Sequence, residues 1–271
     1  GGTWTFEIAA SGRLFGQGTT LAVDADGKAH VAFREMGNFS LVYATNAGGS
    51  WTSIVLDYKG TTGMDTGLAI GTDDKVHISY YDGTGKLGYA TNSPWKITTI
   101  RELGYVPNAE DAMALAIDDA GAHHVAFYDR SITGLRYATD ISGSWSTTIV
   151  EEEGAVGQYC DIAVDSNRKA HICYFDAANN DLWYATNAGG SWATVKVDET
   201  GLVGTYASIA VDQNGKAHIS YRDSTDQGLK YATNAGGSWI NETVDDLGNC
   251  GSYSSICLDE GGKVHISYYG G

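Results

Sequence analysis

The chain has 271 residues, of which 36 are glycine and 2 are proline, and 33 acidic against 17 basic side chains give a net charge of −16. This acidity excludes nucleic acid and anionic lipid as partners, because both need a basic surface, and an apolar fraction of 42% excludes a disordered chain. No apolar stretch approaches the roughly 18 residues of a membrane helix, so we expect no membrane insertion. No signal peptide opens the sequence, so we expect any secretion signal to have been removed.

One sequence unit recurs six times along the chain at a constant spacing. The segment LAVDADGKAHVAF at residues 21–33 returns five times in variant form, each copy 47 residues after the one before it. A second block, LVYATNAGGSW, ends at Trp51 and recurs in each of the next four repeats, and its tail also opens the chain at Trp4. A fixed period of this length indicates a repeat architecture.

Each repeat predicts four short strands, which the fifth copy shows in chain order. Strand A covers residues 209–211, the turn 212–216 follows, and strand B covers residues 217–222. Strand C covers residues 229–233, and strand D begins at Trp239 after a glycine-rich turn. Alternating apolar residues, regular turn signals and four strands in a unit of about 40–50 residues are typical of a propeller blade. The sequence therefore predicts an all-β fold, a six-bladed β-propeller, in which residues 1–271 form one domain.

The two ends of the repeat array predict how the ring closes. Trp4 stands 47 residues before Trp51, so we expect the N-terminal strand to close the last blade, which begins near Leu258. Six repeats of 47 residues would need 282 positions, 11 more than the chain has, and the absent ones match residues 225–235, which form strand C of the fifth blade. We therefore expect the last blade to lack strand C. Three explanations stay open: a piece of a longer array, a three-stranded blade, or a strand donated by a partner or a second copy.

The glycine-rich turn between strands C and D resembles the Asp-box of sialidase-type, or BNR-repeat, propellers. The family pattern Ser-x-Asp-x-Gly-x-Thr-Trp is matched in degenerate form by Ala44, Asn46, Gly48, Ser50 and Trp51. The resemblance implies a bacterial-type protein that is secreted or on the cell surface, and it implies a structural role for the turn, away from the usual ligand face. The tryptophans in this register are Trp4, Trp51, Trp95, Trp145, Trp192 and Trp239.

Six histidines share one position of strand B, and we interpret them as structural. Residues spread around six blades do not converge on one metal ion, whose ligands must all lie about 2 Å from it. We expect each ring to bind the turn of its own blade or the aspartate after strand A. These residues are His30, His77, His124, His171, His218 and His265.

Two further groups of residues suggest a disulfide bond and a calcium site. Cys160 and Cys173 stand at opposing positions of one hairpin, which makes a cross-strand disulfide geometrically feasible, with free buried thiols as the alternative. The run of Asp176, Asn179 and Asp181 offers oxygen ligands of the kind that Ca²⁺ takes, although its spacing matches no known loop. We expect no other cofactor and no other metal.

Candidate ligand-binding residues lie where the repeats differ from one another, on the face formed by the D-to-A and B-to-C loops. Trp183 is the one tryptophan outside the Asp-box register. Aromatic faces beside arginine, aspartate and asparagine suit sugar rings, which combine apolar C–H faces with hydroxyl groups. A merely solvated loop face is the alternative. The candidates are Arg34, Asp65, Tyr159, Trp183, Tyr206, Arg222 and Tyr253.

These features favour a non-catalytic extracellular binding or adhesion module that recognises glycans through the loop face or the clefts between blades. Repeated weak sites would gain strength through multivalency. A sialidase-like glycoside hydrolase or lyase is the first alternative, although only Arg34 and Arg222 share a register where sialidases use an arginine cluster. A structural repeat domain that presents a protein ligand within a larger surface protein is the second.

Overall fold

The computed structural model describes residues 5–11, 15–58, 62, 63, 65–106 and 112–270, with backbone only at residues 15–17. The described residues form 22 strands and no helix, so the prediction of an all-β fold is confirmed. None of them belongs to a helix with the length and apolarity needed to span a membrane. The chain divides into two compact units, Gly1–Ala109 and Glu110–Gly271.

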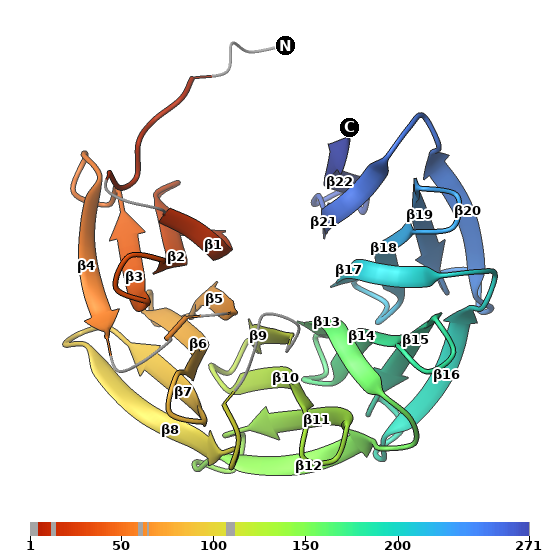
Figure 1. Cartoon of the computed structure of the whole chain (residues 1–271), viewed down its shortest axis with the longest axis horizontal. Coiled ribbons are helices and arrows are strands. Elements are labelled where there is room, and N and C mark those ends of the chain that lie inside the picture. The colour runs from red at the N-terminus through yellow and green to blue at the C-terminus, as the bar shows by residue number, and fades with distance from the viewer. Residues whose placement is uncertain (1–4, 12–14, 59–61, 64, 107–111, 271) are drawn as a thin grey trace. The chain divides into compact units, whose positions relative to one another are not determined.

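The first unit contains two four-stranded antiparallel sheets in which neighbours along the chain are neighbours in the sheet (Figure 1). Sheet 1 consists of β1 (Phe15–Val23), β2 (Ala29–Glu35), β3 (Ser40–Thr45) and β4 (Thr52–Asp57). Sheet 2 consists of β5 (Thr66–Ile70), β6 (Val76–Asp82), β7 (Lys86–Thr91) and β8 (Lys96–Glu102).

The second unit contains three sheets of the same kind and one shorter sheet. Sheet 3 consists of β9 (Met113–Ile117), β10 (His123–Asp129), β11 (Gly134–Thr139) and β12 (Ser146–Glu151). Sheet 4 consists of β13 (Val156–Val164), β14 (Ala170–Asp176), β15 (Asp181–Thr186) and β16 (Ala193–Asp198). Sheet 5 consists of β17 (Val203–Val211), β18 (Ala217–Asp223), β19 (Gly228–Thr233) and β20 (Ile240–Asp245), and sheet 6 of β21 (Cys250–Leu258) and β22 (Val264–Gly270).

Four strands per repeat are thus observed in five repeats, and the sixth repeat has two strands among the described residues. The expected closing strand begins at Trp4, which lies outside the described residues. Residues 5–11 form no strand, and the side chains of Phe6 and Ile8 are 97% and 76% exposed. The number of complete blades and the closure of a ring therefore stay predictions.

The core of the second unit lies between consecutive sheets, where β14 is covered on both faces. All seven residues of β14 are buried, whereas most of the equivalent β22 is exposed because no third strand covers it in the described part of the chain. Close approach of sheet 5 to sheet 4 requires Gly204, whose φ is +101° and whose added Cβ would lie 2.9 Å from the Cα of Leu182. A larger residue there would meet backbone, which cannot move aside as a flexible side chain can.

The candidate disulfide between Cys160 and Cys173 is wrong, because the structure does not join the two residues. The strand register pairs Cys173 with Asp161, next to an irregularity in β13 that shifts the pairing. Cys160 packs between sheets 3 and 4, whereas Cys173 packs between sheets 4 and 5. The two thiols therefore face opposite sides of sheet 4.

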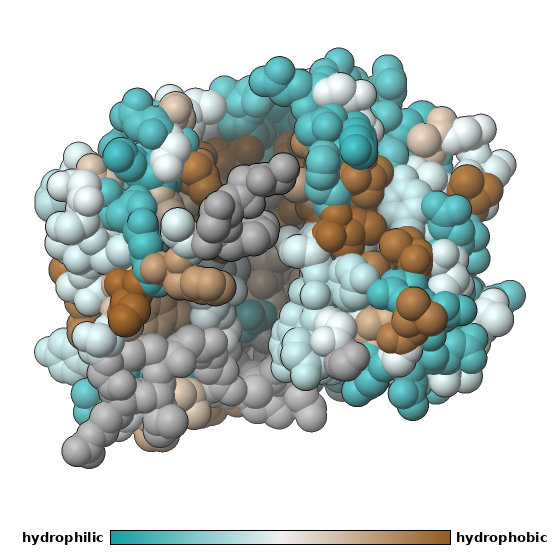
Figure 2. Space-filling model, turned by 90° about the horizontal axis from the view of Figure 1, so that it is seen from above, coloured by the Kyte–Doolittle hydropathy of each residue, from teal (hydrophilic) through white to brown (hydrophobic). Residues whose placement is uncertain are grey.

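The molecular surface mixes polar and apolar residues. On the face drawn in Figure 2, hydrophilic residues predominate and strongly hydrophobic residues form small groups between them. Exposed apolar side chains scattered in this way are ordinary on folded proteins. No binding site is therefore assigned to this exposed surface.

Candidate ligand-binding site

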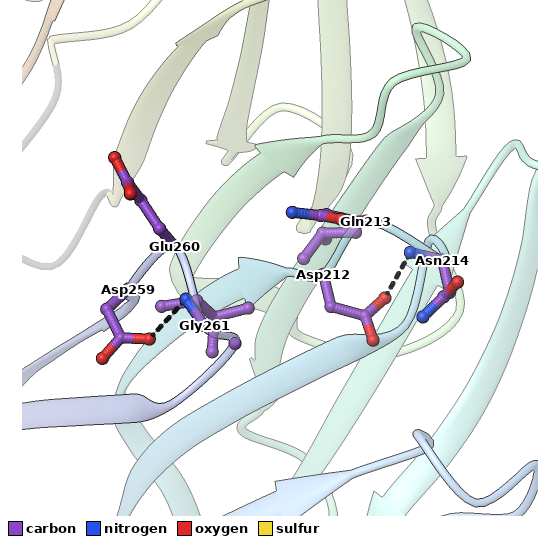
Figure 3. A pocket seen from close by; sticks show the side chains of 9 residues that line it. Asp212, Gln213, Asn214, Asp259, Glu260 and Gly261 are labelled. Atoms are coloured by element: carbon purple, nitrogen blue, oxygen red, sulfur yellow. Dashed lines mark hydrogen bonds between the residues drawn. The ribbon is translucent and has the colours of Figure 1, made fainter.

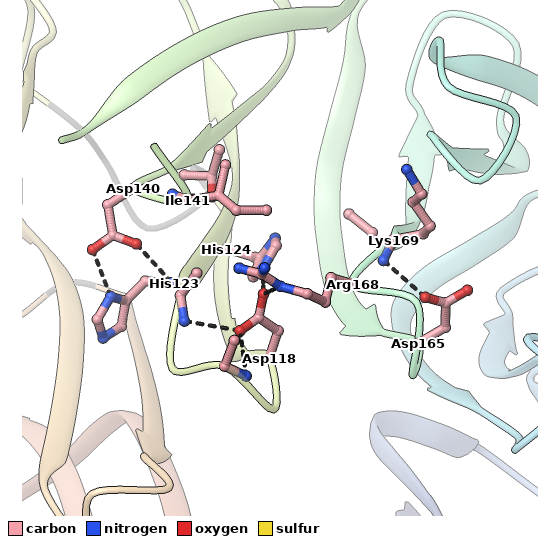
Figure 4. Close-up of polar contacts among 12 residues, drawn as sticks. Asp118, His123, His124, Asp140, Ile141, Asp165, Arg168 and Lys169 are labelled. Carbon is pink, nitrogen blue, oxygen red and sulfur yellow. Dashed lines mark hydrogen bonds and ion pairs between the residues drawn. The ribbon is translucent and has the colours of Figure 1, made fainter. Parts of the chain in front are cut away.

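The repeated histidines are held inside their own sheets. In sheet 3, His124 Nδ1 lies 2.5 Å from the hydroxyl of Tyr137, and Nε2 lies 3.3 Å from Oδ2 of Asp118 (Figure 4). Because a carboxylate only accepts, Nε2 carries the hydrogen and Nδ1 accepts from the tyrosine. Burial keeps the pKa of His124 below its ordinary value, although Asp118 acts in the opposite direction. The same histidine–tyrosine bond recurs in four sheets, as His30–Tyr43, His77–Tyr89, His171–Tyr184 and His218–Tyr231.

The turns that carry the tryptophans are also fixed within the fold. The side-chain oxygen of Asn46 accepts a 2.8 Å hydrogen bond from the backbone N–H of Ala29, which ties the turn between β3 and β4 to the start of β2. Equivalent bonds form in the other four-stranded sheets, from Val76 to Asn92, His123 to Asp140, Ala170 to Asn187 and Ala217 to Asn234. Trp95, Trp192 and Trp239 each pack edge-on, at about 5 Å, against a tyrosine of the preceding sheet.

Three of the expected ligand-binding residues are engaged by neighbouring groups. Arg34 is 6% exposed, lies 4.8 Å from the ring centre of Phe39, and burial lowers its pKa. Asp65 accepts a 3.1 Å hydrogen bond from the backbone N–H of Thr66. The guanidinium of Arg222 donates to the Ser252 hydroxyl and, at 2.5 Å, to the Asn249 side-chain oxygen.

The three expected tyrosines form a row along the first strands of sheets 4, 5 and 6. Tyr159, Tyr206 and Tyr253 all have left-handed backbones, with φ between 49° and 54°, where β13, β17 and β21 bulge. Their ring centres are separated by 5.0 Å and 4.7 Å. Burial first, and then the two neighbouring tyrosines, raise the pKa of Tyr206. The row thus links three sheets.

The two acidic residues considered for calcium are already bound by neighbouring groups. Asp176 accepts hydrogen bonds from the backbone N–H groups of Ala178 and Asn179 and from the amide of Asn179. Asp181 forms a 2.8 Å ion pair with Lys196. Among the residues that the structure describes, no group of three or more histidine, cysteine or acidic side chains is arranged to hold a metal ion. The run is accounted for as a turn between β14 and β15.

A cavity of about 450 Å³ lies between the first turns of sheets 5 and 6 (Figure 3). Its carboxylates serve the turns themselves: Asp212 accepts from the N–H of Asn214 at 2.8 Å, and Asp259 accepts from that of Gly261 at 2.9 Å. The same arrangement fixes the first turn of other repeats. This cavity therefore follows from the spacing of two turns.

A smaller cavity between sheets 3 and 4, which we call the junction pocket, has a different character. Its volume is about 200 Å³, and it contains Trp183, the tryptophan that stands outside the repeat register. The Tyr174 hydroxyl and the Trp183 indole N–H are both buried and have no hydrogen-bond partner among the described residues. The lining residues are Glu151, Glu153, Val156, Tyr174, Asp176, Asn179 and Trp183.

The equivalent places between sheets 1 and 2 and between sheets 4 and 5, which we call junctions, show why the Tyr174 hydroxyl has no partner. Tyr80 donates to Asp57 at 2.9 Å and Tyr221 donates to Asp198 at 2.8 Å, in each case across two consecutive sheets. At the junction pocket the acidic residue is Glu151. Its Oε1 accepts from the backbone N–H groups of Glu152 and Glu153, so it serves the loop after β12.

The second difference lies on the third strand. Lys230, opposite Tyr221 in sheet 5, donates to Asp198 at 2.5 Å and closes that junction with a buried ion pair. In sheet 4 the residue opposite Tyr174 is Trp183, whose ring lies 6.5 Å from that of Tyr174 at an interplanar angle of 25°. The exchange of lysine for tryptophan removes a charge and supplies an aromatic face.

The junction pocket therefore offers two hydrogen-bond donors, an aromatic face and carboxylate acceptors in one recess. Burial, and after it the charges of Glu151 and Asp176, raise the pKa of Tyr174, which keeps its hydroxyl protonated as a donor. The Glu153 side chain is exposed and makes no hydrogen bond or ion pair with the described residues. Such a combination of apolar surface and convergent polar groups is typical of small-molecule sites.

Prediction from the sequence named Trp183 as a ligand-binding candidate, and Asp176 and Asn179 as calcium ligands. It missed Tyr174, because the same residue type occupies this position in Tyr80 and Tyr221, where the hydroxyl is bonded. The available signal was that the aspartate found beside Tyr80 and Tyr221 is replaced by Glu151. At the same place the residue opposite the tyrosine, which is Gly88 and Lys230 in those two sheets, is Trp183.

No family model and no curated protein matches the chain. Among solved structures, a mutant of AofleA from Arthrobotrys oligospora aligns at a TM-score of 0.65 with 13% identity, covering 94% of this chain and 80% of the other. The fucose-specific lectin from Aleuria aurantia aligns at 0.58 with 13% identity, covering 93% and 90%. The intramolecular trans-sialidase from Ruminococcus gnavus aligns at 0.61 with 11% identity, covering 94% and 90%. These likenesses show a shared, propeller-like fold.

Proposed function

We propose that the protein is a glycan-binding propeller and that the junction pocket binds a sugar. The observation that carries this proposal is the pair of buried donors, Tyr174 Oη and Trp183 Nε1, that have no partner among the described residues beside an aromatic face. Leaving a buried donor without a partner costs about 1–3 kcal/mol. A ligand with hydroxyl oxygens removes that cost when it binds, and its C–H face packs on the indole.

The fold likeness supports the same class of ligand. The similar proteins include a fucose-specific lectin and a lectin in complex with α-methyl fucoside. A likeness at this level of identity does not transfer the sugar, and the proposal rests on the pocket's own residues. We further propose that the protein acts outside the cell, secreted or on the surface, as a non-catalytic binding module.

We also propose that the six repeats are the blades of one propeller domain and that the N-terminal segment completes the sixth. Tyr43, Tyr137 and Tyr184 each contact a tryptophan of the following sheet. The equivalent Tyr231 has no such tryptophan among the described residues, and Trp4 has the required repeat register. Its docking would supply the missing contact and cover β22. A strand from a partner or a second copy is the alternative.

Binding by the junction pocket is tested with a glycan array followed by calorimetric titration of the best ligand. We expect Trp183→Ala to weaken binding at least about tenfold, because truncating a well-placed aromatic residue usually removes more than 1 kcal/mol. Wild-type and variant proteins with the same affinity, or a blank array with a correctly folded protein, would refute the proposed function.

The double variant Glu151→Asp with Trp183→Lys is the matched control for pocket shape. It copies the closed junction of Asp198, Tyr221 and Lys230, in which the tyrosine hydroxyl and the lysine ammonium both meet the aspartate. We expect it to fold as well as the wild type and to lose sugar binding, because the introduced aspartate accepts from Tyr174 and the indole face is removed. The same two changes thus separate loss of the site from loss of the fold.

A further inference from the structure

Resting on the proposed function, we propose that the junction pocket selects sugars that carry a free amino group and rejects sugars that carry a carboxylate. The charges around the recess and its size define this class of sugar. It deepens the proposed function by naming the chemical class of sugar.

Three carboxylates line the recess, and their surroundings leave one available. Glu151 is turned to the backbone of its own loop, and Asp176 is held in the turn that follows β14. The side chain of Glu153 has no hydrogen bond or ion pair to the described residues. A ligand ammonium group beside Glu153 would gain a charge-assisted hydrogen bond, which is about twice as strong as a neutral one.

The cation beside Trp183, Lys196, does not offset this negative charge. Lys196 lies 5.7 Å from the ring centre of Trp183, and its ammonium is bound by Asp181 at 2.8 Å and Glu199 at 2.9 Å. Hydrogen bonds to these two acids raise its pKa above the ordinary value. An anionic sugar would therefore meet uncompensated carboxylates in the recess and a chain of net charge −16 around it.

The volume limits the ligand to a single ring. About 200 Å³ is below the roughly 300–1,000 Å³ of pockets that enclose drug-sized ligands. A terminal sugar fits this limit, with one face on the indole of Trp183 and its oxygens toward the two unpartnered donors. Tyr174 lines the recess and its side chain is fully buried, so its hydroxyl is shielded from bulk water.

The test compares methyl glycosides that differ in one substituent, in both the gluco and the galacto series, by calorimetric titration near pH 6. The substituents are hydroxyl, free amine, N-acetyl and, at the sixth carbon, carboxylate. We expect the free amine to bind at least about fivefold more tightly than the hydroxyl parent, the N-acetyl compound to lose that gain, and the carboxylate to bind most weakly. Added salt should reduce the amine's advantage.

The matched variant is Glu153→Gln, which keeps the size of the side chain and removes its charge. We expect it to bring the amine within about twofold of the hydroxyl parent. An amine that binds no better than the hydroxyl parent, or a carboxylate that binds equally well, would overturn this inference and leave the proposed function intact. If no glycoside binds either protein, the proposed function itself fails.

Discussion

At the scale of single residues, Tyr174 and Tyr221 differ only in what meets their hydroxyl groups. Both side chains are fully buried at the same position of sheets 4 and 5. Tyr221 donates to Asp198, whereas Tyr174 has no partner among the described residues. Burial would raise the pKa of Asp198, but the ion pair with Lys230 and the bond from Tyr221 outweigh it and keep the pKa below its ordinary value. The Tyr221 hydroxyl is therefore part of a structural network, and the Tyr174 hydroxyl is not.

This contrast predicts that a tyrosine-to-phenylalanine substitution changes the stability of the protein by different amounts at the two positions. Tyr221→Phe should lower the free energy of unfolding by about 1–3 kcal/mol, because it removes one donor from a buried carboxylate. Tyr174→Phe should change it by less than about 0.5 kcal/mol, or raise it, because no bond is lost. Urea unfolding of the three proteins measures both values. A cost for Tyr174→Phe equal to that for Tyr221→Phe would show that its hydroxyl is bonded in the free protein.

At the scale of elements, β22 is the second strand of sheet 6, and no third strand pairs with it among the described residues. The equivalent strands of sheets 2 to 5 are almost wholly buried, whereas most of β22 is exposed in the structure. An open edge of this kind invites pairing with another strand. The described part of the N-terminal segment already contacts sheet 1, where the indole of Trp51 donates to Glu7 at 2.7 Å.

The proposed closure of sheet 6 predicts that Trp4 protects β22. Trp4→Ala should speed amide hydrogen exchange across residues 264–270. The proposed contact of Trp4 with Tyr231, which would hold the N-terminal segment over β22, would be lost. Trp4→Phe, which keeps an aromatic ring for Tyr231, should retain most of the protection. Exchange that is equally fast in all three proteins would contradict closure by this segment and favour a donated strand.

At the scale of the whole molecule, the repeat explains what the sequence could predict. Six near-identical copies fix the positions of strands and turns, because the same alternation and the same turn residues recur in each. The candidate disulfide failed for a local reason. An irregularity in β13 moves Cys160 out of line with Cys173, and such bulges leave no clear mark in residue type.

The pocket was only partly predictable, because it depends on how side chains meet across two sheets. Trp183 stood out as a tryptophan outside the register, but the role of Glu151 follows from one extra methylene that turns its carboxylate to the loop. Arg34 shows the converse case. Its place at the end of β2 suggested a ligand contact, yet the residue is almost fully buried beside Phe39.

The most direct measurement is a titration of ¹⁵N-labelled protein with the bound sugar, observed at the indole N–H signals of the tryptophans. Trp183→Phe identifies the Trp183 signal by its loss. We predict that this signal moves on binding, because its N–H gains a hydrogen-bond acceptor, while those of Trp95, Trp192 and Trp239, packed between sheets, stay in place. Sugar binding that leaves the Trp183 signal unmoved would contradict the assignment of the site to the junction pocket.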